Sequence, residues 1–88
     1  MPSPKDVNPS NFKVKKVLFD NDSFSIAYGM WQGQDSVIAM RWNGDNENDM
    51  GYPKTFGNPM WFIVHDDLKE MIIKGLVDLN PSILLENT

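Results

Sequence analysis

Residues 24–31 read Phe-Ser-Ile-Ala-Tyr-Gly-Met-Trp, and this octapeptide decides the fold. Large side chains occupy positions 24, 26, 28 and 30, whereas positions 25, 27 and 29 hold Ser, Ala and Gly. An alternation with a period of two is typical of a β-strand, because successive side chains point to opposite faces of a sheet. We therefore predict a strand with one bulky face and one face of small residues, on which Trp31 is the single large side chain.

The segments on either side of this strand predict partners for it. Residues 32–35, Gln-Gly-Gln-Asp, predict a hairpin turn, and residues 36–42 alternate again, with bulky Ile, Met and Trp on one face. Upstream, residues 12–19 alternate imperfectly around Lys15 and Lys16, which predicts a strand with a bulge at the lysine pair. These patterns predict three antiparallel strands.

A fourth strand and a helix follow. Residues 60–64, Met-Trp-Phe-Ile-Val, form a short aromatic and β-branched run that favours a strand. Next comes a helix that Asp66 or Asp67 is expected to cap, with Glu70 completing a capping box. Its predicted apolar stripe repeats at spacings of three and four residues and comprises Leu68, Met71, Ile72, Leu76 and Leu79. The predicted fold class is α+β: a four-stranded antiparallel meander with one C-terminal helix packed on one face, which leaves the other sheet face open.

The ends of the chain have a different character. Residues 1–11 hold three of the six prolines and no apolar periodicity, which predicts a flexible leader (1–11) before a single α+β domain (12–88). Near the other end, the apolar residues 83–85 are expected to fold back or to meet a partner.

Composition narrows the class of protein. Hydrophobic residues make up 41% and charged residues 23% of the 88, which is typical of a globular domain. No apolar run approaches the roughly 20 residues that a bilayer span needs, so we expect no membrane partner. The chain has no cysteine, and its first residues do not resemble a secretory signal, so we expect a cytoplasmic protein.

Charge is distributed unevenly along the chain. The formal net charge is −4, which disfavours a protein that binds nucleic acid through bulk charge. Residues 1–19 carry four lysines and one aspartate, net +3, whereas residues 20–53 carry one arginine and six acidic residues, net −5. This asymmetry suits self-association, including a homodimer, or a basic protein partner.

Nothing in the sequence favours catalysis or a metal site. The chain lacks a cysteine nucleophile, and its only histidine, His65, lies at a strand-to-helix junction where capping or simple exposure is expected. Asp45, Glu47 and Asp49 alternate as in a calcium loop, but Met50 stands where the turn glycine is required. We therefore expect no catalytic residue, no metal, no cofactor and no enzymatic activity.

The long connection of residues 43–59 is the first candidate for function, because loops longer than about 12–15 residues are uncommon in compact domains. Aromatic and basic residues gather in it and beside it. Two of the tryptophans are expected to complete the small core instead of binding a partner. The candidate partner-binding residues are Trp31, Arg41, Trp42, Tyr52, Lys54 and Phe56.

One known family shares this order of elements. Arg41-Trp42 at a strand end, a polar connection with glycines, a short apolar strand over 61–64 and an acid-capped helix from Asp66 resemble the transcriptional coactivator positive cofactor four family. The resemblance covers about residues 12–79 and implies four strands, one helix and binding of single-stranded DNA. It would place Arg41, and more loosely Trp42, against the nucleic acid. Lys54 is the only basic residue between Arg41 and Lys69, where that family usually has a lysine- and glycine-rich approach to the last strand.

We therefore expect a small non-enzymatic binding module that recognises a protein, or a second copy of itself, through the open sheet face and the loop 43–59. The alternative is a transcription-related protein that binds single-stranded nucleic acid. A third class, a small enzyme or ligand-binding domain with a pocket under the loop, is the weakest of the three.

Overall fold

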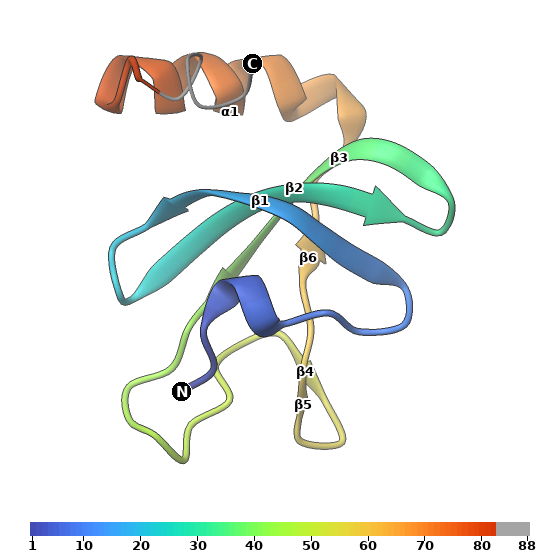
Figure 1. The fold of residues 1–88 in the computed structure, drawn as a ribbon, viewed down its shortest axis with the longest axis vertical. Coiled ribbons are helices and arrows are strands. Elements are labelled where there is room, and N and C mark those ends of the chain that lie inside the picture. Colours follow the sequence, from blue (N-terminus) through green and yellow to red (C-terminus); the bar gives the residue numbers. More distant parts are fainter. Residues whose placement is uncertain (83–88) are drawn as a thin grey trace.

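The computed structural model describes residues 1–82 as an antiparallel sheet with one long helix on one side and a short 3-10 turn on the other (Figure 1). The four strands of the main sheet lie in the order β1-β2-β3-β6, which confirms the predicted α+β class. A separate two-stranded ribbon pairs β4 with β5. The elements are η1 (Pro4–Asp6), β1 (Phe12–Asp20), β2 (Phe24–Trp31), β3 (Gln34–Trp42), β4 (Lys54–Thr55), β5 (Asn58–Pro59), β6 (Phe62–Ile63) and α1 (Asp66–Leu79).

The strand pairing follows the alternation of the sequence. β2 pairs along its length with β3, with Ala27 opposite Ala39. β1 pairs with β2, and its register shifts between Val14 and Lys16, which confirms the irregularity predicted at the lysine pair. β6 has only two residues, fewer than the five predicted for the fourth strand, because the chain pairs with β3 only opposite Ala39 and Met40.

The face of small residues on β2 is the centre of the core. Ala27 of β2 lies there beside Val37 and Ala39 of β3, and these residues pack with Val7, Phe12 and Trp61. The rings of Phe12 and Trp61 have centroids 5.7 Å apart, and the Trp61 Nε1 donates to the Val7 carbonyl at 2.7 Å. The prediction of an open sheet face is therefore wrong. Small side chains on β2 left space, and aromatic side chains from outside β2 fill it.

The segment before Phe12 takes part in this core. Val7 is 1% exposed, and residues 4–6 form η1 with Pro4 buried. The predicted flexible leader thus contains a core residue. Proline fixes its own backbone dihedral, which lowers the entropy lost when such a segment folds. A search for apolar periodicity does not detect this effect.

Helix α1 lies across the opposite face of the sheet, the face to which Ile38 points by strand alternation (Figure 1). Leu76 is its one buried residue, at 4% exposure. The predicted stripe is only partly right, because Leu68, Met71 and Leu79 remain exposed.

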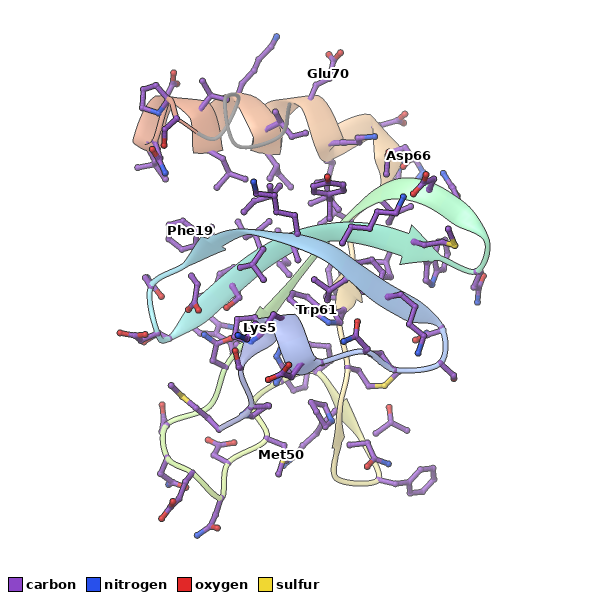
Figure 2. The ribbon with its side chains drawn as sticks, in the orientation of Figure 1. Lys5, Phe19, Met50, Trp61, Asp66 and Glu70 are labelled. Carbon is purple, nitrogen blue, oxygen red and sulfur yellow. The ribbon has the colours of Figure 1, made fainter. Side chains whose placement is uncertain are left out.

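The predicted cap of α1 is also wrong. The N-cap is His65, whose Nδ1 accepts a hydrogen bond from the Asp67 backbone N–H at 3.1 Å. A capping box needs its acidic partner at the third helical position, which Leu68 occupies. Figure 2 shows Glu70 directed away from the sheet. Of the two roles expected for His65, capping or simple exposure, the structure shows capping by a side chain that is also largely exposed.

Within residues 1–82, no helix combines the length and the apolar character needed to cross a bilayer. The expectation for residues 83–85 lies outside the described residues.

Candidate binding site

The long connection after β3 is divided into two loops by one cross-strand contact. Trp42 and Tyr52 form an antiparallel bridge, in which the Trp42 N–H donates to the Tyr52 carbonyl at 2.8 Å and the Tyr52 N–H to the Trp42 carbonyl at 3.0 Å. Residues 43–51 form an acidic loop inside this bridge, and residues 54–59 form the β4–β5 hairpin beyond it. Both lie below the main sheet, on the side of η1 (Figure 1).

Arg41 holds both parts of the connection to the sheet. Its side chain is 1% exposed, and one guanidinium nitrogen donates to the Met60 carbonyl at 2.7 Å while the other donates to the Met50 carbonyl. Burial lowers the pKa of Arg41, and the negative charge of Asp49 acts in the opposite direction. The sequence predicted Arg41 as a partner-binding residue. The structure instead buries it, where its guanidinium links the two loops to the sheet by hydrogen bonds.

The acidic loop is held by hydrogen bonds of its own. The Asp49 carboxylate accepts from the backbone N–H of Gly51 at 2.9 Å and from that of Asp45 at 3.0 Å. These two backbone donors, Gly51 first, lower the pKa of Asp49. At the base of the loop, buried Asn43 accepts from the Ser25 hydroxyl at 2.8 Å and donates to Asp20. The loop therefore has a defined shape.

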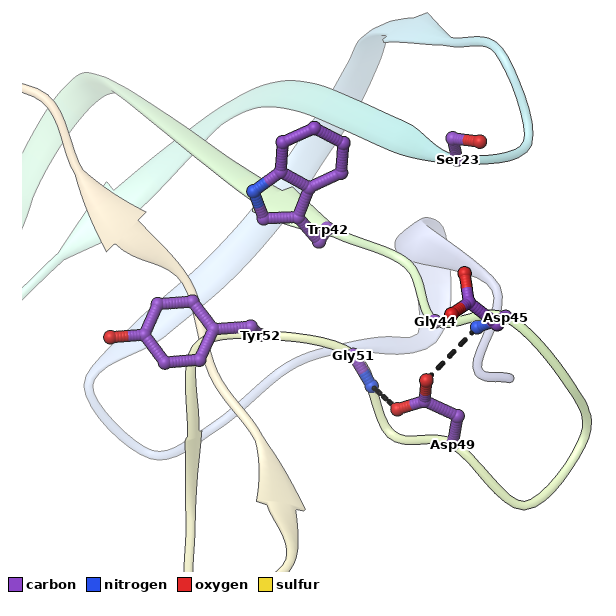
Figure 3. Close-up of a pocket in the computed structure, with 7 residues that line it drawn as sticks. All are labelled: Ser23, Trp42, Gly44, Asp45, Asp49, Gly51 and Tyr52. Carbon is purple, nitrogen blue, oxygen red and sulfur yellow. Dashed lines mark hydrogen bonds between the residues drawn. The ribbon is translucent and has the colours of Figure 1, made fainter.

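A hollow of about 330 Å³ lies at the mouth of this loop (Figure 3). Trp42 stands on one side of it, with 57% of its surface exposed. Its ring packs edge-on against Phe24, with centroids 4.7 Å apart, so the indole is fixed although it faces solvent. The hollow is lined by Ser23, Trp42, Gly44, Asp45, Asp49, Gly51 and Tyr52.

Phe56 lies at the tip of the β4–β5 hairpin and is 100% exposed. Its φ is +50° and that of Gly57 is +78°, the pattern of a two-residue type I′ turn. Asn, Asp and Gly are preferred at both central positions of such a turn, because a side chain there crowds the backbone. Phe56 therefore combines a strained backbone with an apolar ring in water.

Trp31 lies apart from these residues. In the pairing of β2 with β3, Trp31 is opposite Gln34, whereas Trp42 is opposite Phe24 at the other end of both strands. Phe24 and Trp31 are seven residue steps apart along the strand, a distance of roughly 23 Å. Trp31 is half-buried against the core, and Trp61 is buried within it, which confirms that two of the tryptophans complete the core.

Of the six predicted residues, the structure pairs Trp42 with Tyr52, and it places Lys54 and Phe56 on the β4–β5 hairpin that follows. Sequence reasoning missed the lining role of Ser23, Asp45 and Asp49 and the structural role of Asn43. One signal was available for Asn43, because it continues the alternation of Ala39 and Arg41 along the buried face. The others depend on the path of the loop.

Among residues 1–82, no cluster of three or more histidine and acidic side chains is arranged to hold a metal ion. Comparison with known proteins adds no relationship, because no family model, curated protein or solved structure matches the chain.

Proposed function

We propose that the chain is a non-enzymatic protein-binding module that contacts its partner through the loop surface, defined as Trp42, Tyr52 and Phe56. The observation that carries this proposal is the conformation of Phe56, fully exposed in a left-handed turn. A residue that is unfavourable in two respects for the fold points to a role outside it.

The energetics of Phe56 favour an anchoring role. Burying a phenylalanine side chain contributes about 1.5–3 kcal/mol, and in the free protein this ring gains none of it. An apolar pocket on a partner would supply that burial. Rigid aromatic residues that insert into pockets are typical of the few positions that dominate binding energy. Tyr52, 68% exposed, would flank the anchor.

The charge of the acidic loop indicates the charge expected around the binding pocket of the partner. Asp45, Glu47 and Asp49 lie on the acidic loop next to the hairpin, and Lys54 is the one basic residue of the connection. A partner whose apolar pocket has a basic rim fits this surface, because complementary charge accelerates association and excludes acidic competitors. A second copy of this chain carries three lysines on its first strand, of which Lys15 is ion-paired with Asp35 of the same chain.

Single-stranded nucleic acid is the alternative that the family resemblance implies. Its expected phosphate contact, Arg41, is buried, and the acidic loop would repel a phosphate backbone beside Trp42. Under this alternative, the exposed Trp42 would still be able to stack on a base. These observations favour a protein partner.

The test compares partner binding by the wild type with binding by Phe56→Asn. A partner identified by capture is purified, and the affinity of the binary complex is measured by titration calorimetry; self-association is measured by sedimentation velocity. We expect Phe56→Asn to weaken binding by about tenfold or more, a loss of at least about 1.4 kcal/mol.

Met71→Gln is the matched control, because Met71 is also exposed, at 66%, but lies on α1. It should bind like the wild type. Equal affinity of the wild type and Phe56→Asn would contradict the proposal. Micromolar, salt-sensitive binding of an unstructured oligonucleotide that quenches tryptophan fluorescence would establish the alternative.

A further inference from the structure

We propose that the hollow between Trp42, Asp45 and Asp49, called here the cation pocket, binds the positively charged end of a lysine or arginine side chain. The inference rests on the proposed function, since it names the chemical group of the partner that this part of the surface recognises. It extends that function from an apolar anchor to a second, polar contact.

The aromatic wall of the cation pocket is preorganised. Trp42 packs edge-on against Phe24 and is bridged through its backbone to Tyr52, so its indole does not need to be ordered on binding. An aromatic face attracts a cation through its quadrupole, most strongly for tryptophan. Figure 3 shows the indole and the Asp49 carboxylate on opposite sides of Gly44 and Gly51.

The floor of the pocket is bare backbone. Gly51 has a φ of +74°, and a Cβ at this position would lie 2.1 Å from the Trp42 carbonyl oxygen. A Cβ at Gly44, whose φ is +110°, would lie 2.4 Å from the Asp49 carbonyl oxygen. Neither position tolerates a side chain, so this backbone path requires glycine at both places. Its volume, about 330 Å³, accommodates the end of a long side chain.

The charge around the pocket favours a cation. Two backbone N–H donors hold Asp49 in its ionised form, while the carboxylate of Asp45 lies exposed at the rim. Lys54 and the N-terminal ammonium are the cations that act on Asp49 from outside, and both stabilise its charged form. Arg41 lies behind Gly51 with its guanidinium committed to two carbonyls. The residues that line the pocket include two carboxylates, those of Asp45 and Asp49, and no basic side chain.

The same features argue against other ligands. An anion would meet two carboxylates, and no metal-binding cluster is found among residues 1–82. An organic cation is the ligand class that uses both the indole and the carboxylates.

The test is an NMR titration of the ¹⁵N-labelled full chain, followed at the indole N–H of Trp42. The probes are the N-acetyl, N-methylamide derivatives of lysine, arginine and norleucine; norleucine has a similar apolar stem without the charge. We expect saturable shifts with the lysine or arginine probe at millimolar concentration, and none with norleucine. Binding should weaken as salt rises, because exposed charges are screened beyond about 10 Å at 0.1 M.

Two variants of equal charge test the location. Asp45→Asn removes a carboxylate that lines the pocket, whereas Glu47→Gln removes one from the same loop that does not line it. We expect Asp45→Asn to weaken binding of the charged probes by roughly three- to tenfold, and Glu47→Gln to weaken it less than twofold. Trp42→Leu should weaken it by on the order of tenfold, with Trp42→Phe between the two. Trp42→Leu and Trp42→Phe lack the indole N–H, so the backbone amide signals of Asp45 and Gly51 are followed in these two variants instead.

Phe56→Asn separates this inference from the proposed function, because Phe56 does not line the pocket. It should bind the charged probes like the wild type. If it loses partner binding while the wild type shows no saturable shift with any charged probe, the cation pocket is wrong and the proposed function stands. If the probes bind but partner affinity is unaffected by Phe56→Asn, the anchor is wrong. Equal weakening by Asp45→Asn and Glu47→Gln would also overturn the pocket, since it would mean that the charged probes respond to the overall charge of the loop and not to a defined site.

Discussion

Phe56→Asn should make the protein more stable while removing its proposed anchor. The Phe56 backbone has a φ of +50°, which costs an ordinary residue about 1–2 kcal/mol and asparagine less. The ring is 100% exposed, so its removal takes no packing from the fold. The variant also creates an Asn-Gly pair, the preferred sequence for a type I′ turn. We expect the free energy of unfolding to rise by about 0.5–1.5 kcal/mol.

Urea unfolding at 25 °C measures this change. For a small domain with an m-value of about 1–1.5 kcal/mol/M, the midpoint should move upward by roughly 0.3–1.5 M. The melting temperature should rise as well, by about 4–8 °C for each kcal/mol.

Phe56→Ala is the control for that experiment, because it removes the ring but keeps a side chain in the strained turn. Its stability should lie within about 0.5 kcal/mol of the wild type. A Phe56→Asn variant less stable than the wild type by more than about 0.5 kcal/mol would refute the reasoning, since it would mean that the ring contributes to the fold.

Three further predictions concern the fold beneath the loop surface. Leu76→Ala should destabilise the protein by about 2–4 kcal/mol in urea unfolding, because Leu76 is the buried residue of α1; a change below about 0.5 kcal/mol would mean that the helix packs differently. Arg41→Ala should cost about 2–4 kcal/mol in the same assay, since it leaves the Met50 and Met60 carbonyls without their donor, and an unchanged midpoint would contradict the structural role. The pKa of Asp49 is lowered in the folded state, so its contribution to the free energy of unfolding is complete above its unfolded pKa of about 4 and is lost as pH falls through the folded pKa. Asp49→Asn should therefore make the free energy of unfolding less dependent on pH between about pH 5 and pH 2. An unchanged pH dependence would contradict the role of the backbone hydrogen bonds to Asp49.

The sequence predicted the sheet well because strand alternation is a local property. The alternation of residues 24–31 and 36–42 predicts the pairing of β2 with β3, and the lysine pair predicts the irregularity in β1. The helix was likewise readable from the three- and four-residue spacing of its apolar residues. Its cap was not, because choosing between His65 and the next two aspartates requires the geometry of the first turn.

The candidate site was predicted less well, because it depends on long-range packing. Small residues on one sheet face are compatible with an open platform or with a core filled from elsewhere, and Phe12 and Trp61 fill it here. Arg41 at a strand end is compatible with a phosphate contact or with a buried tie, and the Met50 and Met60 carbonyls decide between them. Tyr52 and Phe56 could be predicted because large aromatic residues in a long polar loop have no local structural role, and Trp42 because it lies at the strand end beside that loop.

The most direct test of the loop surface as the binding site is an NMR map of the complex. The ¹⁵N-labelled chain is titrated with the purified partner, and chemical-shift changes are followed along residues 1–82. We predict that the largest changes fall on residues 42–59, with Phe56 and Gly57 among them, and that α1 changes little. Changes concentrated on β1 or on the exposed face of α1, with the hairpin tip unaffected, would contradict the account.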